Sequence, residues 1–348
     1  MKMRRIMAML LAGAMCVGAM AGCGSTGGSS ASGQSGGAAA SSGKKLSGKI
    51  AFIISNKDEY QSALDQGVKA AGMAKGIEVT SVDCASDMDR QIDQVKAEVA
   101  NGAAALIVLV ADDTRADEII EAAGDTPVVF VNRIPQDTKL IDEKHPYVGS
   151  NEDESGVFQG EMLAEALKKE KKDSVNYLML QGTAGLLHTT KRSEGVLKAL
   201  KDAGITATEV VPAIDCGYDR TTAMNKILEL KANGTDLSKI DCLLCNNDAM
   251  ALGGIEGLRQ CDVDISKVKV VGVDGTGAGL QAITDGTMTA TVFQNAVGQA
   301  SASLQAAINL ATGEKLTKDI SYDTDKNNKG IIWIPFEKVT PDNVSDYF

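Results

Sequence analysis

Short apolar runs alternate with longer amphipathic segments along most of the chain, and this alternation limits the possible folds more than any other feature. Continuous apolar strands joined by helical crossovers indicate parallel sheets that are covered on both faces. The pattern runs through residues 49–132 and repeats from residue 153 to residue 294. We therefore expect an α/β protein with two doubly wound parallel-sheet lobes. The strand candidates are 49–54, 77–83, 105–110, 127–132, 175–180, 204–212, 240–245, 267–274 and 289–294.

The first residues of the chain have the composition of an export signal. Three basic residues, Lys2, Arg4 and Arg5, precede an apolar stretch that is too short for a stable membrane span. The ending Met20–Cys23 resembles a bacterial lipobox, in which cleavage occurs before a Cys that becomes diacylated. We expect residues 1–22 to be a lipoprotein signal peptide and Cys23 the lipidation site. The alternative is an ordinary secretory signal with an incidental Cys.

A segment of Gly, Ser and Ala follows the proposed lipid site. Residues 24–43 have no apolar periodicity and cannot build a core. Some 20 residues of this kind span roughly 25 Å on average. We therefore expect residues 23–46 to be a lipidated, flexible tether that holds an extracytoplasmic domain at the cell membrane.

The charge balance argues against a nucleic-acid partner. The formal net charge is −11 at pH 7, and the proposed signal peptide contributes only basic residues. An acidic chain without a basic, aromatic-rich stretch is not expected to bind nucleic acid. Residues 47–348 are long enough for two lobes with separate cores.

Five cysteines lie beyond the N-terminal segment, and an odd number argues against a complete disulfide framework. Cys242 and Cys245 have the CxxC spacing of metal or redox sites. However, residues i and i+3 of a strand point to opposite faces of the sheet. We expect buried free thiols.

Polar side chains follow several of the predicted strands. Asn132, Asn246, Asn247 and Asp274 all lie where an apolar run ends. In open α/β sheets, ligands bind in the crevice beyond the carboxyl ends of the strands. The alternative is that such residues only cap helices, and we expect Asp248 to do so. Their recurrence at equivalent ends favours a binding cleft.

Several motifs together resemble the type I periplasmic sugar-binding proteins of ABC importers, and most of all their glucose/galactose-binding members. The resemblance covers nearly all of residues 48–348. The motifs are "VVFVNRIP", "YVGSNEDESGVFQGEMLA", "CNNDAMALGGIEGL", "VVGVDGTGAGLQAI", "GTMTATVFQN" and "IIWIPFEKVTPDN".

The resemblance implies two lobes joined by three hinge strands. The crossings are expected near Val148–Asn151, Gln294 and Lys326–Ile331. The N-terminal lobe would comprise residues 48–148 plus 295–325, and the C-terminal lobe residues 151–293 plus 331–348. Trp333 would be a packing residue on the last strand, beyond the third crossing.

The resemblance also implies a set of ligand-binding residues. Carboxylates, amides and Arg can pair with adjacent sugar hydroxyls, and aromatic rings cover the apolar faces of a pyranose. Tyr218 replaces a Trp of the glucose/galactose-binding members, and Gln294 replaces their hinge Asn. The residues implied are Asp58, Tyr60, Asn132, His188, Arg192, Tyr218, Asn247, Asp274 and Gln294.

Two departures bear on the ligand. Leu186 occupies the place of a His, and His188 that of an acidic residue, so glucose and galactose themselves are in doubt. A surface position on the first helical turn is the other reading of His188. In Lys168–Ser174, four lysines replace the oxygen ligands of a calcium loop, so we expect no metal there.

The leading hypothesis is a lipid-anchored receptor that closes around a hexose-like monosaccharide of the galactose/glucose class. It would deliver the sugar to an ABC permease with its ATPase, as a monomer without cofactors. One alternative is a chemosensory or autoinducer-2-type receptor of the same fold. An enzyme is disfavoured because we find no GxSxG nucleophile elbow, no HExxH motif and no P-loop motif. A lactose-repressor-type regulator is disfavoured because the tether occupies the place of a DNA-binding headpiece.

Overall fold

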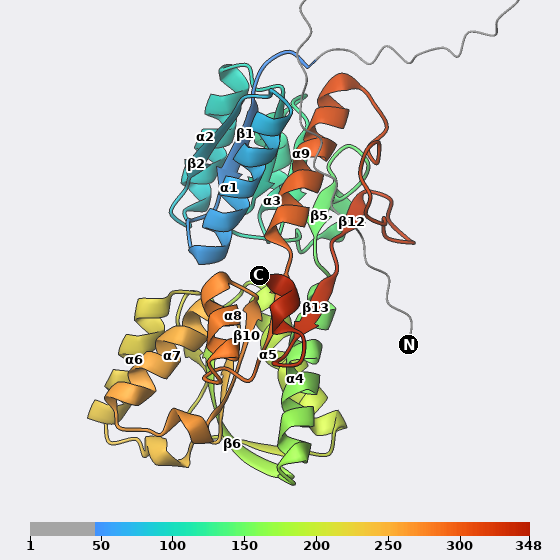
Figure 1. The fold of residues 1–348 in the computed structure, drawn as a ribbon. Coiled ribbons are helices and arrows are strands. Elements are labelled where there is room, and N and C mark those ends of the chain that lie inside the picture. The colour runs from blue at the N-terminus through green and yellow to red at the C-terminus, as the bar shows by residue number, and fades with distance from the viewer. Residues whose placement is uncertain (1–45) are drawn as a thin grey trace, which may run out of the picture. The chain divides into compact units, whose positions relative to one another are not determined.

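The computed structural model describes residues 46–348. The predictions for the signal peptide, for Cys23 and for all but the last residue of the tether therefore lie outside the described residues. The described chain forms two α/β lobes, each built on its own sheet (Figure 1).

The sheet of the N-terminal lobe has the strand order β12-β5-β4-β3-β1-β2, and every pairing in it is parallel. Its central strands are fully buried apolar runs, as expected for a sheet that is covered on both faces. The strands are β1 (Ile50–Ile54), β2 (Val79–Asp83), β3 (Ala105–Leu109), β4 (Val128–Val131), β5 (Tyr147–Gly149) and β12 (Ile331–Trp333).

Helices cover both faces of this sheet. Ile50, Phe52 and Ile54 pack into a core with α1 (Glu59–Ala74) and α9 (Ala296–Thr312). Ala51 and Ile53, which point to the other face, pack with α2 (Met88–Ala100) and α3 (Ala116–Ala123). A short 3₁₀ helix, η1 (Thr138–Leu140), precedes β5.

The sheet of the C-terminal lobe has the order β13-β11-β10-β9-β6-β7, with β8 also paired to β6. Only the pairing of β13 with β11 is antiparallel among its described strands. The strands are β6 (Ser174–Gln181), β7 (Thr206–Glu209), β8 (Ile214–Asp215), β9 (Cys242–Cys245), β10 (Lys269–Asp274), β11 (Ala290–Gln294) and β13 (Phe336–Val339).

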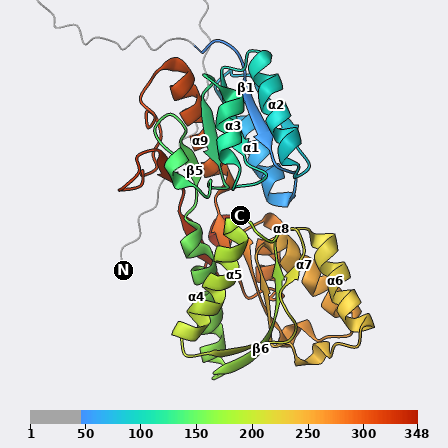
Figure 2. The ribbon, with the colours of Figure 1, turned by 180° about the vertical axis from the view of Figure 1, so that it is seen from behind.

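The helices of this lobe also form two layers, which can be followed from both sides in Figures 1 and 2. One core contains residues of α6, α7 and α8, and the other contains residues of α4 and α5. The elements are α4 (Glu152–Lys169), α5 (Leu187–Asp202), α6 (Arg220–Ala232), α7 (Asp248–Gln260), α8 (Gly277–Thr284), η2 (Leu237–Lys239), η3 (Ile265–Lys267) and η4 (Val344–Tyr347).

The five cysteines of the described chain are free and buried, as predicted. Cys242 belongs to the core beneath α4 and α5, whereas Cys245 belongs to the core beneath α6 and α7. The CxxC spacing therefore places the two thiols on opposite faces of β9.

Three chain segments connect the two sheets, and the third differs from the prediction. The first two follow β5 and β11. The sequence analysis assigned residues 331–348 to the C-terminal lobe, but β12 pairs in parallel with β5 of the N-terminal sheet. The third connection is therefore the dipeptide 334–335, and Trp333 packs edge-on against Tyr147 of the N-terminal lobe. The pairing with β5 holds β12 in this sheet, and the backbone N–H of Ile334 extends it by donating to Gly149 O (2.8 Å).

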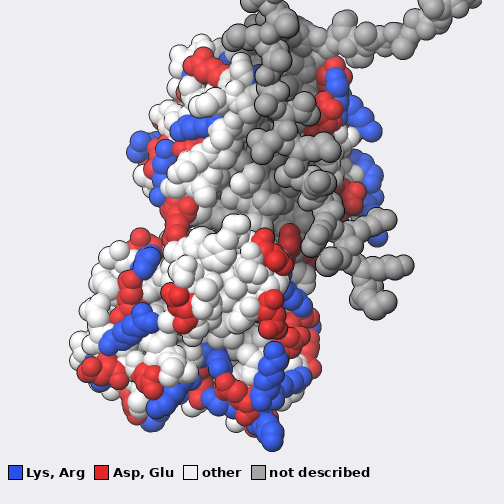
Figure 3. All heavy atoms as spheres, in the orientation of Figure 1, with Lys and Arg blue, Asp and Glu red and all other residues white. Residues whose placement is uncertain are grey.

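Acidic and basic side chains are interspersed on the C-terminal lobe in the view of Figure 3. The lobe has ion pairs between neighbouring elements, such as Lys191 with Asp153 (2.6 Å) and Lys338 with Glu161 (2.5 Å). On the described part of this face, the basic residues do not merge into a continuous patch.

Candidate functional site

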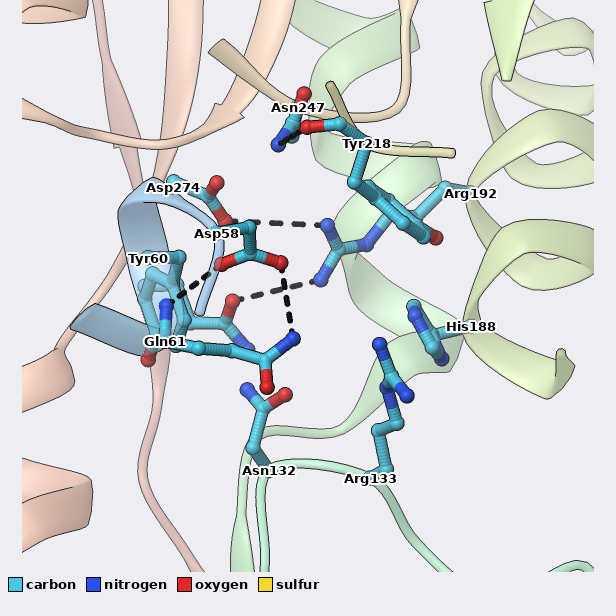
Figure 4. Close-up of a pocket in the computed structure, with 11 residues that line it drawn as sticks. Asp58, Tyr60, Gln61, Asn132, Arg133, His188, Arg192, Tyr218, Asn247 and Asp274 are labelled. Atoms are coloured by element: carbon cyan, nitrogen blue, oxygen red, sulfur yellow. Dashed lines mark hydrogen bonds and ion pairs between the residues drawn. The ribbon is translucent and has the colours of Figure 1, made fainter. Parts of the chain in front are cut away.

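A cavity lined by residues of both lobes lies beyond the carboxyl ends of the strands. It encloses about 300 Å³, including its opening to solvent. All nine residues named above line it, and Gln61 and Arg133 complete the lining (Figure 4). The nine residues therefore lie together around one cavity, and their role in ligand binding stays a prediction.

Three of the lining residues have left-handed backbone conformations. The φ angles are 65° at Asn132, 62° at Tyr218 and 118° at Asp274. Such conformations are unfavourable for residues other than Gly, and they cluster at functional sites. Asn132 and Asp274 each come directly at the end of a strand, where the chain turns and aims the side chain into the cavity.

Arg192, on α5, is held by the protein itself. Its Nε and Nη2 donate to the two oxygens of Glu152 (3.1 and 2.8 Å), and Nη1 donates to Asn246 O (2.9 Å). The second hydrogen of Nη2 is directed to Gln294 Oε1 (3.4 Å). Of the five guanidinium N–H groups, one on Nη1 is left for a ligand. Burial opposes the charge, but Glu152 more than offsets this, so the pKa of Arg192 is raised.

The two carboxylates of the cavity differ in their surroundings. Asp58 caps α1 by accepting from Gln61 N (2.7 Å) and Gln61 Nε2 (2.9 Å), and burial raises its pKa. Asp274 is buried, and its nearest cation is Nη1 of Arg192 at 3.9 Å. Burial raises the pKa of Asp274 well above its ordinary value, and Arg192 opposes this only in part. A ligand hydroxyl would supply the hydrogen bond that the Asp274 carboxylate lacks.

Asn247 has a divided role. Its Oδ1 accepts from Met250 N (2.9 Å), so Asn247 itself is the N-cap of α7. Its Nδ2 contacts Tyr218 O only at 3.5 Å and is the group that can serve a ligand. The cap therefore fixes the direction in which the amide points.

The prediction that Asp248 caps this helix was wrong. Asp248 is the first helical residue, and its carboxylate accepts from Thr276 N (2.9 Å) and Thr291 Oγ1 (2.6 Å). It thereby joins α7 to β11 and to the loop after β10. Oδ1 of the neighbouring Asn246 accepts from Gly182 N (3.0 Å), which is far away in the sequence.

His188 is buried and does not lie on the surface. Its ring stacks on Tyr218, with ring centroids 5.2 Å apart and an interplanar angle of 20°. Burial lowers the pKa of His188 well below its ordinary value, and the charges of Arg133 and Arg192 lower it further. The imidazole is therefore neutral at pH 7, so one ring nitrogen can donate and the other accept. Tyr218 is fixed by the hydrogen bond between its hydroxyl and Thr189 Oγ1 (2.7 Å).

Two polar atoms of the cavity wall are buried without a hydrogen-bond partner among the described residues. They are Oη of Tyr60 and Nε2 of Gln294. As whole residues, Tyr60 is 7 % exposed and Gln294 is 2 % exposed. A buried polar group without a partner costs about 1–3 kcal/mol. Such groups are explained when a ligand supplies the missing bonds.

Arg133 and Gln61 were not identified from the sequence. Arg133 donates to Val110 O (3.2 Å), and no described carboxylate forms an ion pair with it. The sequence feature that could have pointed to Arg133 is its position directly after Asn132, at the end of a strand. Gln61 orients Asp58, and only its spacing of three residues from that carboxylate could have pointed to it.

The described residues contain no group of three or more His, Cys, Asp or Glu that could hold a metal ion. None of the helices in residues 46–348 is long and apolar enough to cross a membrane. The cavity thus offers hydrogen-bond donors, acceptors and aromatic rings as its chemistry.

The fold and the cavity define a class of protein, and comparison with known families agrees. Residues 50–315 match the model of the periplasmic binding protein domain, and the chain belongs to this family. Its two parallel-sheet lobes are those of the type I periplasmic binding proteins.

Individual relatives are similar over most of their length. The chain is 29 % identical to a putative rhizopine-binding protein of Rhizobium meliloti, over 83 % of this chain and 89 % of the relative. It is 29 % identical to a D-galactose/methyl-galactoside binding periplasmic protein of Haemophilus influenzae, over 83 % and 88 %. A solved ABC transporter solute-binding protein of Bacillus halodurans with bound myo-inositol is 28 % identical, with a TM-score of 0.71, over 86 % and 96 %.

Proposed function

We propose that this protein is the extracytoplasmic solute receptor of an ABC importer and that it captures a hexose-like monosaccharide in the cavity between its lobes. The receptor would close around the sugar and deliver it to a permease with its ATPase. No covalent step is part of this function, and the receptor acts as a monomer.

One observation carries the proposal. Side chains from seven separate elements or turns meet around one cavity, and two of these side chains have buried polar atoms without partners among the described residues. Asn247 and Arg192 already bond the protein through some of their polar groups and leave another N–H free. These side chains are therefore held in place within their own lobe before the ligand arrives, which reduces the entropic cost of binding.

The free groups match the chemistry of a small polyhydroxylated ring. Asp274 accepts from a hydroxyl, the free N–H groups of Asn247 and Arg192 donate to hydroxyl oxygens, and neutral His188 can do either. Tyr60 and Tyr218 can cover the apolar C–H faces of such a ring. Exclusion of water by the closed lobes strengthens these hydrogen bonds.

The names of the relatives support a sugar or a cyclic polyol as the class of ligand. Those with 28–29 % identity are named for rhizopine, for galactose, for ribose and allose, and for myo-inositol. We propose a hexose of the galactose/glucose class, with His188 selecting among epimers because it replaces an acidic residue of the glucose/galactose-binding members.

A thermal-shift screen with aldoses, ketoses, inositols, disaccharides and autoinducer-2 tests the function. A ligand at 1,000-fold excess over its Kd stabilises by about 4 kcal/mol, so Tm should rise by at least about 5 °C for a hexose. A shift only with inositols or pentoses would replace the hexose class, and a shift with autoinducer-2 alone would favour the signalling alternative. If no compound raises Tm, the proposed function fails.

We further propose that Cys23 carries the lipid that holds the receptor at the cell membrane. The support is the lipobox-like Met20–Cys23 and the Gly/Ser-rich segment after it. Metabolic labelling with a palmitate analogue should mark the wild-type protein and leave Cys23→Ala unmarked. Equal labelling of both proteins would contradict the assignment.

A further inference from the structure

The helix that carries His188 and Arg192 into the cavity has an unusual N-terminus. Each of the other described α-helices of the C-terminal lobe begins with a side chain that caps it: Asn151 for α4, Asp219 for α6, Asn247 for α7 and Thr276 for α8. The N-cap position of α5 is Leu186, which cannot accept a hydrogen bond through its side chain. The first free N–H groups of α5 therefore need a partner from elsewhere.

That partner comes from the other lobe. Oδ2 of Asp113, in the loop after β3, accepts a hydrogen bond from the backbone N–H of Leu187, the first residue of α5 (2.9 Å). Asp113 is only 2 % exposed. An anionic carboxylate at a helix N-terminus is stabilised by the helix dipole as well as by the hydrogen bond.

The carboxylate is held in place from within its own lobe. Oδ1 of Asp113 accepts from Gln136 Nε2 (2.9 Å), and the backbone N–H of Gln136 donates to Asp113 O (2.9 Å). Asp113 therefore reaches across to α5 without needing to reorient. Asp113 is not among the residues that line the cavity.

We propose that Asp113 is an interlobe latch, a positioning residue that caps α5 only when the lobes are closed and so holds the closed state around the ligand. The latch rests on the proposed function, because a bound sugar is what the lobes close around. It means that Asp113, which lies outside the cavity lining, also affects the affinity for the sugar. Opening would return the Leu187 N–H and one carboxylate oxygen to water. Because apparent affinity scales with the population of the binding-competent state, the latch lowers the measured Kd.

Two substitutions remove the bond from opposite sides. Asp113→Ala removes the acceptor. Leu187→Pro removes the donor and fits the first helical position, because Pro is favoured there and Leu186 is already extended (φ −73°, ψ 137°). The matched control is Asp112→Ala, which also removes one charge from this loop. The Asp112 carboxylate accepts only from Thr114 N and Thr114 Oγ1, within its own loop (3.0 and 2.6 Å).

The dissociation rate of the sugar found in the screen is the main measurement, by stopped flow on the purified protein. Each latch variant should dissociate about tenfold faster, with a smaller change in the association rate. The double variant should be no faster than the single variants, because both remove one bond. The latch would be overturned if a latch variant has the same ligand-free Tm as Asp112→Ala and also releases the sugar at the same rate as Asp112→Ala.

Amide hydrogen exchange at Leu187 in the sugar-saturated protein tests the same bond directly, because the latch exists only in the closed state. Exchange should be faster in Asp113→Ala than in Asp112→Ala. Sugar binding with equal exchange in these two variants would overturn the latch and leave the proposed function standing. A wild-type protein that binds no compound of the panel would overturn the proposed function, and with it the ligand around which the latch is proposed to close.

Discussion

Asp274 combines a strained backbone with an uncompensated charge. Its φ is 118°, its side chain is buried, and Arg192 lies 3.9 Å away and is already paired with Glu152. A residue of this kind does not hold the core together. It stores a desolvation cost that a ligand hydroxyl can reduce.

Asp274→Asn should therefore leave the ligand-free protein at least as stable as the wild type. Asn tolerates the left-handed conformation, and the substitution removes a buried charge. We expect the free energy of unfolding to stay within about 1 kcal/mol of wild type or to rise, as measured by urea denaturation. A loss of several kcal/mol would mean that Asp274 is a structural residue.

Asp248 predicts a pH dependence of stability. Burial raises its pKa to about 7, although Thr291 and the backbone N–H of Thr276 favour the ionised form. This pKa is higher than in the unfolded chain, where a carboxyl titrates near about 4. Between these two pKa values the folded protein holds a proton that the unfolded chain has released. The contribution of Asp248 to stability is therefore largest below about pH 4 and is lost as the pH rises toward about 7.

Urea denaturation at several pH values between 5 and 8.5 checks this expectation. The free energy of unfolding of Asp248→Asn should fall less steeply with pH than that of the wild type. Parallel profiles for the two proteins would show that another group titrates in this range.

At the scale of single residues, the strand-end rule predicted Asn132, Asn247 and Asp274, because a strand end can be read from the apolar run before it. It could not predict Arg133 or Gln61, whose neighbours in the cavity come from distant parts of the chain. The contacts of Asp248 with Thr276 and Thr291 were missed for the same reason.

At the scale of elements, close packing of α4 on α5 positions the Arg192 guanidinium. Glycines make this approach possible: a Cβ at Gly156 would lie 2.9 Å from Arg192 Cα, and one at Gly160 would lie 2.6 Å from Val196 O. Gly195, on the facing side of α5, would meet Gly156 Cα at 3.0 Å. Both helices therefore pack backbone against backbone.

Gly156→Ala should displace α5 and disturb both stability and binding. Overpacking costs about 1–3 kcal/mol, which exceeds the roughly 1 kcal/mol that Ala contributes through helix propensity. We expect a lower Tm and weaker sugar binding, because Arg192 and His188 move with the helix. The control is Gly277→Ala in α8, where a Cβ meets no atom within 4 Å and no loss of stability is expected. Equal effects at the two positions would contradict this account.

The type and order of most elements could be predicted, because apolar runs and helical periodicity are local signals. The sheet to which β12 belongs could not. A strand of three residues carries no information about its partner. The pairing of β12 with β5 joins two segments that are far apart in the sequence. The interlobe bond of Asp113 is likewise invisible in sequence, since its two ends lie 74 residues apart.

At the scale of the whole molecule, the proposed function depends on two lobes that contribute residues to one cavity. Asp58, Asn132 and Arg133 come from the N-terminal lobe, while Arg192 and Asp274 come from the C-terminal lobe. Neither lobe alone can surround a small ring. Binding and closure are therefore one event, and residues of both lobes should change the affinity for the same ligand.

The most direct test is isothermal titration calorimetry of wild-type protein and Asp274→Asn with the sugars of the panel. We predict that the wild type binds one hexose per molecule and that the folded variant loses at least about 100-fold in affinity, because a buried donor of the sugar is left without its charged acceptor. Absence of binding by the wild type, or equal binding by both proteins, would contradict the claim that this cavity is a sugar site.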